Sequence, residues 1–265
     1  MSYKMFSNNK LYKLFILILI YFLNIFFDKY YIKYHSFDKI KNENLNNQKF
    51  NYVKSSKEYW EQRYKKGGNS GPGSYHHLAN FKAEVINNFI IKNNINTVIE
   101  WGSGDCNQVS LINYKKYFGY DVSKSAINLC KTKFKNDRSK TFIYIDQNFK
   151  NKIKGDLSIS LDVIFHLIED DVFNKYMKNL FDSSNKYVCI YSSNSLSKPS
   201  GKYTRQRIFT DWIDIHESNK WKLKEFIPNK FPFDNKKMSS TSFSDFYFYE
   251  KIECKFSLFK ICIYK

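Results

Sequence analysis

The chain has 265 residues, with 43 lysines and arginines against 25 aspartates and glutamates and a formal net charge of +18. Hydrophobic residues make up 43% and aromatic residues 19% of the sequence, which excludes a wholly disordered protein. The length suffices for one large domain, or for one domain and a tail. The positive charge is compatible with nucleic acid or an anionic membrane as a partner, but lysine is abundant along the whole chain, which favours a diffuse basic surface.

The first thirty residues differ from the rest of the chain in composition, because they contain a long apolar run. Residues 14–27 are almost entirely apolar, and Lys4, Lys10 and Lys13 precede them. This run is shorter than the roughly 20 residues that span a bilayer, but it extends back to Leu11 if the Lys13 side chain reaches the interface. An uncleaved membrane anchor is the preferred interpretation, with a signal peptide or a core helix as alternatives. The orientation in the membrane stays open.

Composition and periodicity divide the chain into four parts. The predicted boundaries are 1–30 for the apolar segment, 31–56 for a linker, 57–251 for the folded domain and 252–265 for a C-terminal extension. Four of the nine glycines lie in a loop over 67–73. No lysine follows these glycines, which argues against a P-loop and predicts an entry loop or lid.

Helix-like and strand-like segments alternate within the domain. Helices are predicted over 59–64, 81–93, 123–133, 170–181 and 209–217. Strands are predicted over 97–99, 117–120, 141–145, 157–161, 186–191, 221–227 and 243–250, and residues 255–264 are a candidate edge strand. This alternation predicts an α/β fold in which helices cover both faces of a mostly parallel sheet.

A glycine turn joins the first two of these strands. Residues 97–99 are a β-branched run that Glu100 closes, and Gly102 and Gly104 then allow a sharp turn with close backbone approach to a ligand. A helix-like segment follows, and the second strand ends on Asp121. A nucleotide-binding β-α-β unit has this layout, with the acid placed for the ribose hydroxyls.

Four strands in a row end on an acidic residue or beside one. These residues are Glu100, Asp121, Asp146 and Asp162. Ligands of open α/β sheets bind across the carboxyl ends of the strands, so a single ligand can contact all four. Each acid alone is a common strand or helix cap, but together with the glycine turn they predict a ligand pocket.

Five cysteines bear on the redox environment. They are Cys106, Cys130, Cys189, Cys254 and Cys262, and no two of them form a Cys-x-x-Cys pair. An odd number of scattered cysteines argues against a disulfide framework and against a zinc site. We therefore expect no metal, and a reducing compartment for the folded part.

The motifs resemble those of the class I S-adenosylmethionine-dependent methyltransferases. Residues 100–106, Glu-Trp-Gly-Ser-Gly-Asp-Cys, are similar to the first motif of that family, and residues 119–123, Gly-Tyr-Asp-Val-Ser, to the second. Residues 156–170 are similar to the fourth-strand motif and the turn after it. The resemblance covers about residues 57–251. It implies a Rossmann-like seven-stranded, mostly parallel sheet, here preceded by the N-terminal apolar helix, and S-adenosylmethionine as the cofactor.

The resemblance also implies a role for each matching residue. Glu100 would steer the methionine ammonium group, Asp121 would accept the ribose hydroxyls, and Asp146 would lie beside the adenine amino group. The full set of implied cofactor-binding residues is Glu100, Gly102, Gly104, Asp121, Asp146, Leu161, Asp162 and Trp60. Cys106 departs from the pattern, because the family usually has a third glycine there for close helix–strand packing.

Methyl transfer requires few catalytic groups from the protein, because the sulfonium cofactor is already an activated methyl donor. A base is needed only for a protonated nucleophile, and His166 and Asp162 are the candidates. A packed or capping histidine is the alternative for His166. Arg205 and Arg207 are candidates for holding an anionic acceptor, with a solvated basic loop as the alternative.

Two other functions stay open. A NAD-dependent oxidoreductase shares the first β-α-β unit, but its Tyr-x-x-x-Lys pair would here be Tyr247 and Lys251, about 13 Å apart along a strand. The other is a membrane-tethered basic binding module with a degenerate cofactor pocket. The methyl acceptor is unidentified: a small molecule, a lipid or sugar, or a protein side chain. Nucleic acid stays open but is not favoured, and the absence of an Asn-Pro-Pro-Tyr-type motif argues against adenine methylation in DNA.

Overall fold

The computed structural model describes residues 55–146, 149–150, 152–196 and 203–253. The predicted apolar segment and the candidate edge strand over 255–264 lie outside the described residues. In the described part, none of the helices has the length and hydropathy needed to span a bilayer.

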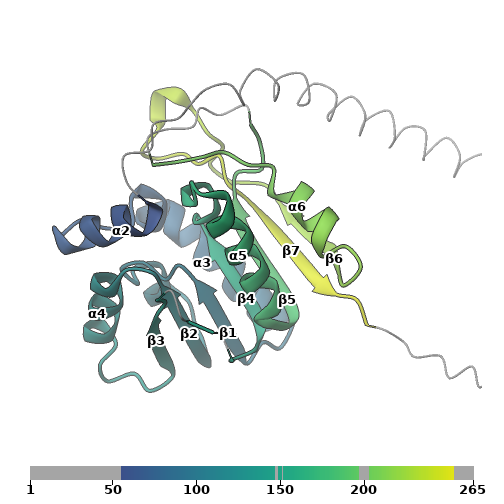
Figure 1. Cartoon of the computed structure of the whole chain (residues 1–265), viewed down its shortest axis with the longest axis horizontal. Coiled ribbons are helices and arrows are strands. Elements are labelled where there is room, and N and C mark those ends of the chain that lie inside the picture. The colour runs from purple at the N-terminus through teal and green to yellow at the C-terminus, as the bar shows by residue number, and fades with distance from the viewer. Residues whose placement is uncertain (1–54, 147–148, 151, 197–202, 254–265) are drawn as a thin grey trace, which may run out of the picture. The chain divides into compact units, whose positions relative to one another are not determined.

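A seven-stranded mixed sheet forms the centre of the described domain (Figure 1). Its strands lie in the order β3-β2-β1-β4-β5-β7-β6. They are β1 (Thr97–Trp101), β2 (Lys116–Asp121), β3 (Lys140–Tyr144), β4 (Gly155–Leu161), β5 (Ser184–Ser192), β6 (Trp221–Ile227) and β7 (Asp245–Lys251). Strands β1 to β5 pair in parallel, and β7 runs antiparallel to both β5 and β6. The predicted seven-stranded, mostly parallel sheet is thereby confirmed.

Helices cover both faces of this sheet (Figure 1). The α-helices are α2 (Ser56–Lys65), α3 (His76–Lys92), α4 (Lys124–Lys133), α5 (Asp170–Asp182) and α6 (Phe209–His216), and the short 3-10 helices are η1 (Pro72–Ser74), η2 (Gln108–Leu111), η3 (Ile164–His166) and η4 (Asn235–Lys237). Neighbouring residues of a strand point to opposite faces. Val98 accordingly packs in one core with α3 and α4, and Ile99 packs in the other with α5 and α6.

Helix α4 begins where the sequence predicts it. The hydroxyl of Ser123 accepts a hydrogen bond from the backbone N–H of Ala126 at 3.0 Å, so Ser123 is the N-cap. A cap of this kind contributes about 1 kcal/mol to stability. Ala126, Ile127 and Cys130 are buried, as their helical spacing predicted.

The segment after the glycine turn is not an α-helix, and in this respect the prediction is wrong. Residues 102–115 connect β1 to β2, and the helix within them is the four-residue η2. Parallel strands need a connection of a dozen or more residues. In the connection from β1 to β2, the glycine turn occupies the first few residues. Too little chain is left for an α-helix and its two turns.

A disulfide joins this short connection to α4. Cys106 and Cys130, both fully buried, are bonded with their Cα atoms 5.5 Å apart, while Cys189 is free and buried. The expectation of a chain without a disulfide is therefore wrong. Sequence spacing did not show that the loop after Gly104 passes the inner face of α4. Because the chain contains this disulfide, the cysteines no longer indicate a reducing compartment.

Candidate active site

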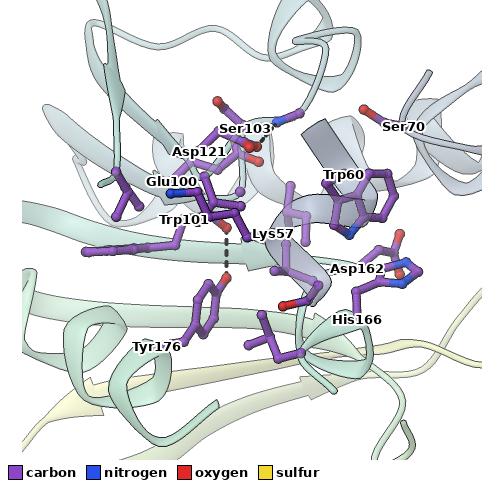
Figure 2. A pocket seen from close by; sticks show the side chains of 18 of the residues that line it. Lys57, Trp60, Ser70, Glu100, Trp101, Ser103, Asp121, Asp162, His166 and Tyr176 are labelled. Atoms are coloured by element: carbon purple, nitrogen blue, oxygen red, sulfur yellow. Dashed lines mark hydrogen bonds between the residues drawn. The ribbon is translucent and has the colours of Figure 1, made fainter. Parts of the chain in front are cut away.

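A cavity of about 460 Å³ lies at the carboxyl ends of β1, β2 and β4 (Figure 2). The chain leaves β1 toward β2 on one side, and β4 lies on the other, so this is the point where the strand order reverses. Nine of the eleven predicted site residues line the cavity. These are Trp60, Glu100, Gly102, Gly104, Asp121, Asp146, Leu161, Asp162 and His166. Figure 2 shows Glu100, Asp121 and Ser103 on one side, and Trp60, Asp162 and His166 on the other.

The glycine turn requires glycine at both predicted positions. Gly102 has a φ of 87° and Gly104 a φ of 55°, in the left-handed region that favours glycine. A Cβ atom on Gly102 would lie 2.6 Å from Cγ2 of Val163, and one on Gly104 would collide with the hydroxyls of Ser70 and Tyr64. Side chains at these positions would therefore strain the backbone and close the cavity floor.

Asp121 is fixed by the backbone of the same turn. Its Oδ2 accepts the N–H of Gly104 at 2.9 Å, and its Oδ1 accepts the N–H of Ser123 at 2.8 Å. Burial raises the pKa of Asp121 to about 6, although these hydrogen bonds oppose the shift. A carboxylate has about four lone-pair directions, so Asp121 can still accept hydrogen bonds from hydroxyl groups in the cavity.

Glu100 is a buried carboxylate in β1, one residue before the strand ends. Its side chain accepts the hydroxyl of Tyr117 at 2.6 Å. Burial raises the pKa of Glu100 to about 7, against the lowering effects of the Tyr117 hydrogen bond and the Lys82 charge. A cation in the cavity would favour the ionised form of this group.

Asp162 is held on both carboxylate oxygens. Oδ2 accepts Nζ of Lys82 at 2.7 Å, and Oδ1 accepts the hydroxyl of Ser244 at 2.8 Å. Its φ of 58° is uncommon for a residue with a side chain and costs about 1–3 kcal/mol. The ion pair and the hydrogen bond hold the Asp162 carboxylate in place, so the geometry favours a positioning role for Asp162 and leaves His166 as the candidate base.

His166 presents one defined tautomer to the cavity. Its Nδ1 lies 3.2 Å from the carbonyl oxygen of Tyr203. A carbonyl only accepts hydrogen bonds, so Nδ1 carries the proton and Nε2 has the lone pair. Burial lowers the pKa of His166 to about 4, so the ring is neutral at pH 7. The Trp60 ring meets it edge-on, with centroids 4.9 Å apart.

Helix α2 forms one wall of the cavity and is fastened to its neighbours at two places. The Glu61 carboxylate accepts the hydroxyls of Ser123 and Ser125, both at 2.8 Å, at the start of α4. The hydroxyl and N–H of Ser56 donate to Glu169, which precedes α5, at 2.7 and 2.8 Å. Trp60 lies between these two attachments and faces the cavity.

Arg205 and Arg207 do not line the cavity. Both form ion pairs with Asp170, at 3.0 and 2.6 Å, and the Arg207 guanidinium lies 4.4 Å from the Phe173 ring centroid. These contacts tie the segment before α6 to the start of α5. That the two arginines hold an anionic acceptor stays a prediction.

Sequence reasoning missed several residues of the cavity wall. They are Lys82, Ser103, Gln108 and Tyr176. Lys82 has a signal in the sequence, because it lies four residues after Leu78 and four before Ile86 on the apolar stripe of α3. The Tyr176 hydroxyl donates to the Trp101 carbonyl at 2.8 Å, a contact that only the packing of α5 on β1 brings about.

The Tyr-x-x-x-Lys pattern of the oxidoreductase alternative lies away from the cavity wall. Tyr247 and Lys251 are both in β7, which confirms that they fall on a strand. The two side chains are therefore not on a common helix face, as a shared proton relay requires.

At the level of sequence, the chain matches no family profile and no curated protein. Its structure, in contrast, is similar to solved methyltransferases. The N-methyltransferase NodS from Bradyrhizobium japonicum WM9, in complex with S-adenosyl-L-homocysteine, has a TM-score of 0.57 at 10% identity, over 76% of this chain and 100% of that one. Magnesium protoporphyrin IX methyltransferase from Synechocystis PCC 6803, with bound SAM, has a TM-score of 0.53 at 14% identity, over 75% and 98%.

The methyltransferase domain of bacterial CtHen1-C gives a TM-score of 0.51 at 17% identity, over 66% of this chain and 98% of that domain. The described part of the chain therefore has the fold of S-adenosylmethionine-dependent methyltransferases. The fold that the sequence motifs predicted is confirmed.

Proposed function

We propose that this protein is a methyltransferase that uses S-adenosylmethionine and transfers its methyl group to an acceptor that is not yet identified. The observation that carries the proposal is the convergence of the glycine turn and the strand-end acids Glu100, Asp121, Asp146 and Asp162 on one cavity. This cavity lies at the strand-order reversal of a fold shared with proteins crystallised with that cofactor or its demethylated product.

The residues of the cavity fit such a cofactor. The cavity volume of about 460 Å³ falls within the roughly 300–1,000 Å³ that is typical of small-molecule sites. Ser103 Oγ and Gln108 Oε1 are buried in its wall, and neither has a hydrogen-bond partner among the described residues. Buried polar atoms are nearly always paired, so these two atoms indicate a polar ligand. The buried carboxylates of Glu100 and Asp121 suit a ligand that carries positive charge and hydroxyl groups.

The roles proposed for the chain's own residues follow from this fit. Asp121 would accept the ribose hydroxyls, and Glu100 would pair with the ammonium group. Asp146 and Leu161 also line the cavity and would contact the adenine and the methionine part, respectively. Trp60 on α2 would cover the cofactor and exclude water. The bound cofactor supplies the activated methyl group, so orientation of the acceptor accounts for most of the catalysis left to the protein.

His166 would act on an acceptor that carries a proton. Its neutral ring offers the lone pair of Nε2 at the cavity, and the Tyr203 carbonyl holds Nδ1–H on the other side. Nε2 can accept a hydrogen bond from a hydroxyl or amine and take its proton as the new bond to carbon forms. This role favours an O–H or N–H nucleophile.

Calorimetry with the full-length chain tests the proposal. We expect S-adenosylhomocysteine to bind with a micromolar Kd and NAD not to bind. Asp121→Asn should weaken S-adenosylhomocysteine binding at least about tenfold, because it removes a charged hydrogen-bond acceptor. Binding of NAD alone would favour the oxidoreductase, and binding of neither would favour a degenerate binding module.

The predicted membrane anchor over residues 11–27 is proposed from the sequence alone. The apolar run and its flanking lysines support it. Extraction of membranes at alkaline pH separates the alternatives: an anchored chain stays in the pellet, and a chain without residues 1–30 moves to the supernatant.

A further inference from the structure

A glycine-rich segment connects α2 to α3 beside the cavity. Residues 66–75 include four glycines, and Ser70 (Figure 2) and Ser74 of this segment line the cavity. None of residues 67–77 is buried, so the segment is held by hydrogen bonds and not by a packed core. A segment with few buried contacts opens locally at a low free-energy cost.

Unusual backbone angles mark the two ends of this segment. The φ of Gly67 is 78° and that of His76 is 53°, both in the left-handed region. A Cβ atom on Gly67 would meet no atom within 4 Å, so glycine is needed there for the backbone conformation and not for space. Hinges consist of a few residues at the ends of elements that absorb large changes in φ and ψ. Gly67 follows the C-cap of α2 and His76 is the first residue of α3, so both positions suit hinges.

Asp105 fastens the segment to the glycine turn. Its Oδ2 accepts the N–H of Ser70 and the hydroxyl of Tyr75, both at 2.8 Å, and its backbone N–H donates to Ser70 Oγ at 3.1 Å. Burial and the hydrogen bond to Asp105 raise the pKa of Tyr75 to about 12, so this hydroxyl keeps its proton at neutral pH. Because Asp105 lies between Gly104 and Cys106, the turn at the cavity also holds the segment.

The segment also approaches the end of β4. A Cβ atom on Gly73 would lie 2.9 Å from Oδ2 of Asp162, a carboxylate that Lys82 and Ser244 hold in place. An added methyl group at position 73 would therefore push the segment away, because the Asp162 carboxylate cannot turn aside without losing these contacts. The segment thus reaches from the turn after β1 to the end of β4, the two strands between which the cavity lies.

We propose that residues 67–75 form a lid that opens to admit and release the cofactor, with Asp105 as the positioning residue that latches the lid. The inference rests on the proposed function. Ser70 and Tyr75 make the latch contacts, so a weaker latch increases the fraction of molecules in which the lid is open. The cofactor then enters and leaves faster, while its contacts inside the cavity stay the same.

Removal of one latch hydrogen bond tests the lid. Tyr75→Phe deletes only the hydroxyl that donates to Asp105, and Tyr75 does not line the cavity, so the binding surface stays intact. Stopped-flow tryptophan fluorescence of the full-length chain measures the binding of S-adenosylhomocysteine. Its association and dissociation rate constants should both rise at least about fivefold, as expected when a hydrogen bond to a charged group is lost. A purely structural role of Tyr75 would lower the Tm without raising both rate constants.

Two further variants and a second measurement extend the test. Tyr187→Phe, the same chemical change in β5 away from the cavity wall, should keep the wild-type rate constants. Gly73→Ala should raise the dissociation rate constant with the latch intact, because its methyl group collides with Asp162. In hydrogen exchange, saturating S-adenosylhomocysteine should slow the amides of residues 69–75 at least about tenfold in the wild-type protein, and less in Tyr75→Phe. Circular dichroism checks the fold of each variant.

The outcomes separate the two claims. Wild-type rate constants in Tyr75→Phe overturn the latch, and exchange over residues 69–75 that S-adenosylhomocysteine does not slow overturns the lid. Both results leave the proposed function standing. A wild-type protein that does not bind S-adenosylhomocysteine overturns the proposed function itself.

Discussion

Cys106 shows how a single residue preserves a backbone geometry without the usual amino acid. Its φ of 61° is the left-handed conformation for which glycine is the default. The family that the motifs resemble usually has glycine there. In this chain the side chain is directed into a disulfide with Cys130, and the residue is fully buried. The departure from the pattern therefore keeps the turn and replaces a packing contact with a covalent one.

At Glu100 we predict that cofactor binding depends on pH. The pKa of Glu100 is raised to about 7 and that of Asp121 to about 6, so both carboxylates take up protons as the pH falls from 8 to 5.5. A cationic ligand needs Glu100 ionised, so binding below pH 7 must release a proton. By linkage, the affinity for S-adenosylhomocysteine should fall at least about tenfold over this range.

The control for this prediction is Glu100→Gln, which cannot titrate at position 100. Calorimetry at several pH values should give the variant a shallower dependence on pH and weaker binding at pH 8. A wild-type affinity that is constant, or that rises as the pH falls, would contradict the role of Glu100.

At His166 we predict a neutral ring with the proton on Nδ1. The Tyr203 carbonyl fixes this tautomer, and burial lowers the pKa of His166 to about 4, so that the ring stays neutral from pH 8 down to about pH 5. Nitrogen chemical shifts from NMR of the labelled protein report both properties. An imidazolium signal at pH 6.5 would contradict the lowered pKa, and a proton on Nε2 would contradict the assigned tautomer and with it the role of Nε2 as the base.

Among the elements, helix α2 forms one wall of the cavity, and its Glu61 side chain attaches it to the start of α4. Glu61 binds two serines at the start of α4. Glu61→Ala should release α2, because it removes both hydroxyl contacts, and should raise the dissociation rate of S-adenosylhomocysteine about fivefold to tenfold in stopped-flow fluorescence. Lys65→Ala, an exposed residue of the same helix, should leave the rate at the wild-type value. Equal rates in both variants would mean that α2 does not cover the bound ligand.

The connection between β1 and β2 depends on its disulfide more than on its own secondary structure. It holds only the four-residue η2, and the Cys106–Cys130 bond ties it to α4. A crosslink across 24 residues contributes roughly 3 kcal/mol in the chain-entropy description. Cys130→Ser or a reducing agent should therefore lower the Tm by several degrees and weaken cofactor binding. The reducing agent should have no further effect on the Cys130→Ser variant; a reduced wild-type protein with unchanged Tm would contradict this role.

Strands could be predicted from the sequence more fully than the contacts between elements. The β-branched run of β1 and the Ser123 cap of α4 are local signals, and the structure has both elements where these signals predict them. The disulfide joins residues 24 positions apart, and the Lys82–Asp162 pair joins residues 80 positions apart. Such contacts depend on packing, and neither residue spacing nor propensity encodes them. The strand-end acids were predictable because parallel strands bring their carboxyl ends to one edge.

At the scale of the whole molecule, the sheet explains where the cavity lies but does not identify a methyl acceptor. The strand order β3-β2-β1-β4-β5-β7-β6 places the reversal, and with it the cavity, between β1 and β4. Folds of this class serve many chemistries, so the acceptor must be read from the residues around the mouth of the cavity. Trp60 and His166 line the cavity in this chain, and a neutral His166 favours a nucleophile with an O–H or N–H group.

A crystal structure of the protein grown with S-adenosylhomocysteine would show whether the cofactor binds in the cavity at the strand ends. We expect the adenosine over Gly102 and Gly104, with both ribose hydroxyls on the Asp121 carboxylate and the amino acid part toward Glu100. A ligand bound elsewhere on the molecule, or an empty cavity at saturating ligand concentration, would contradict it.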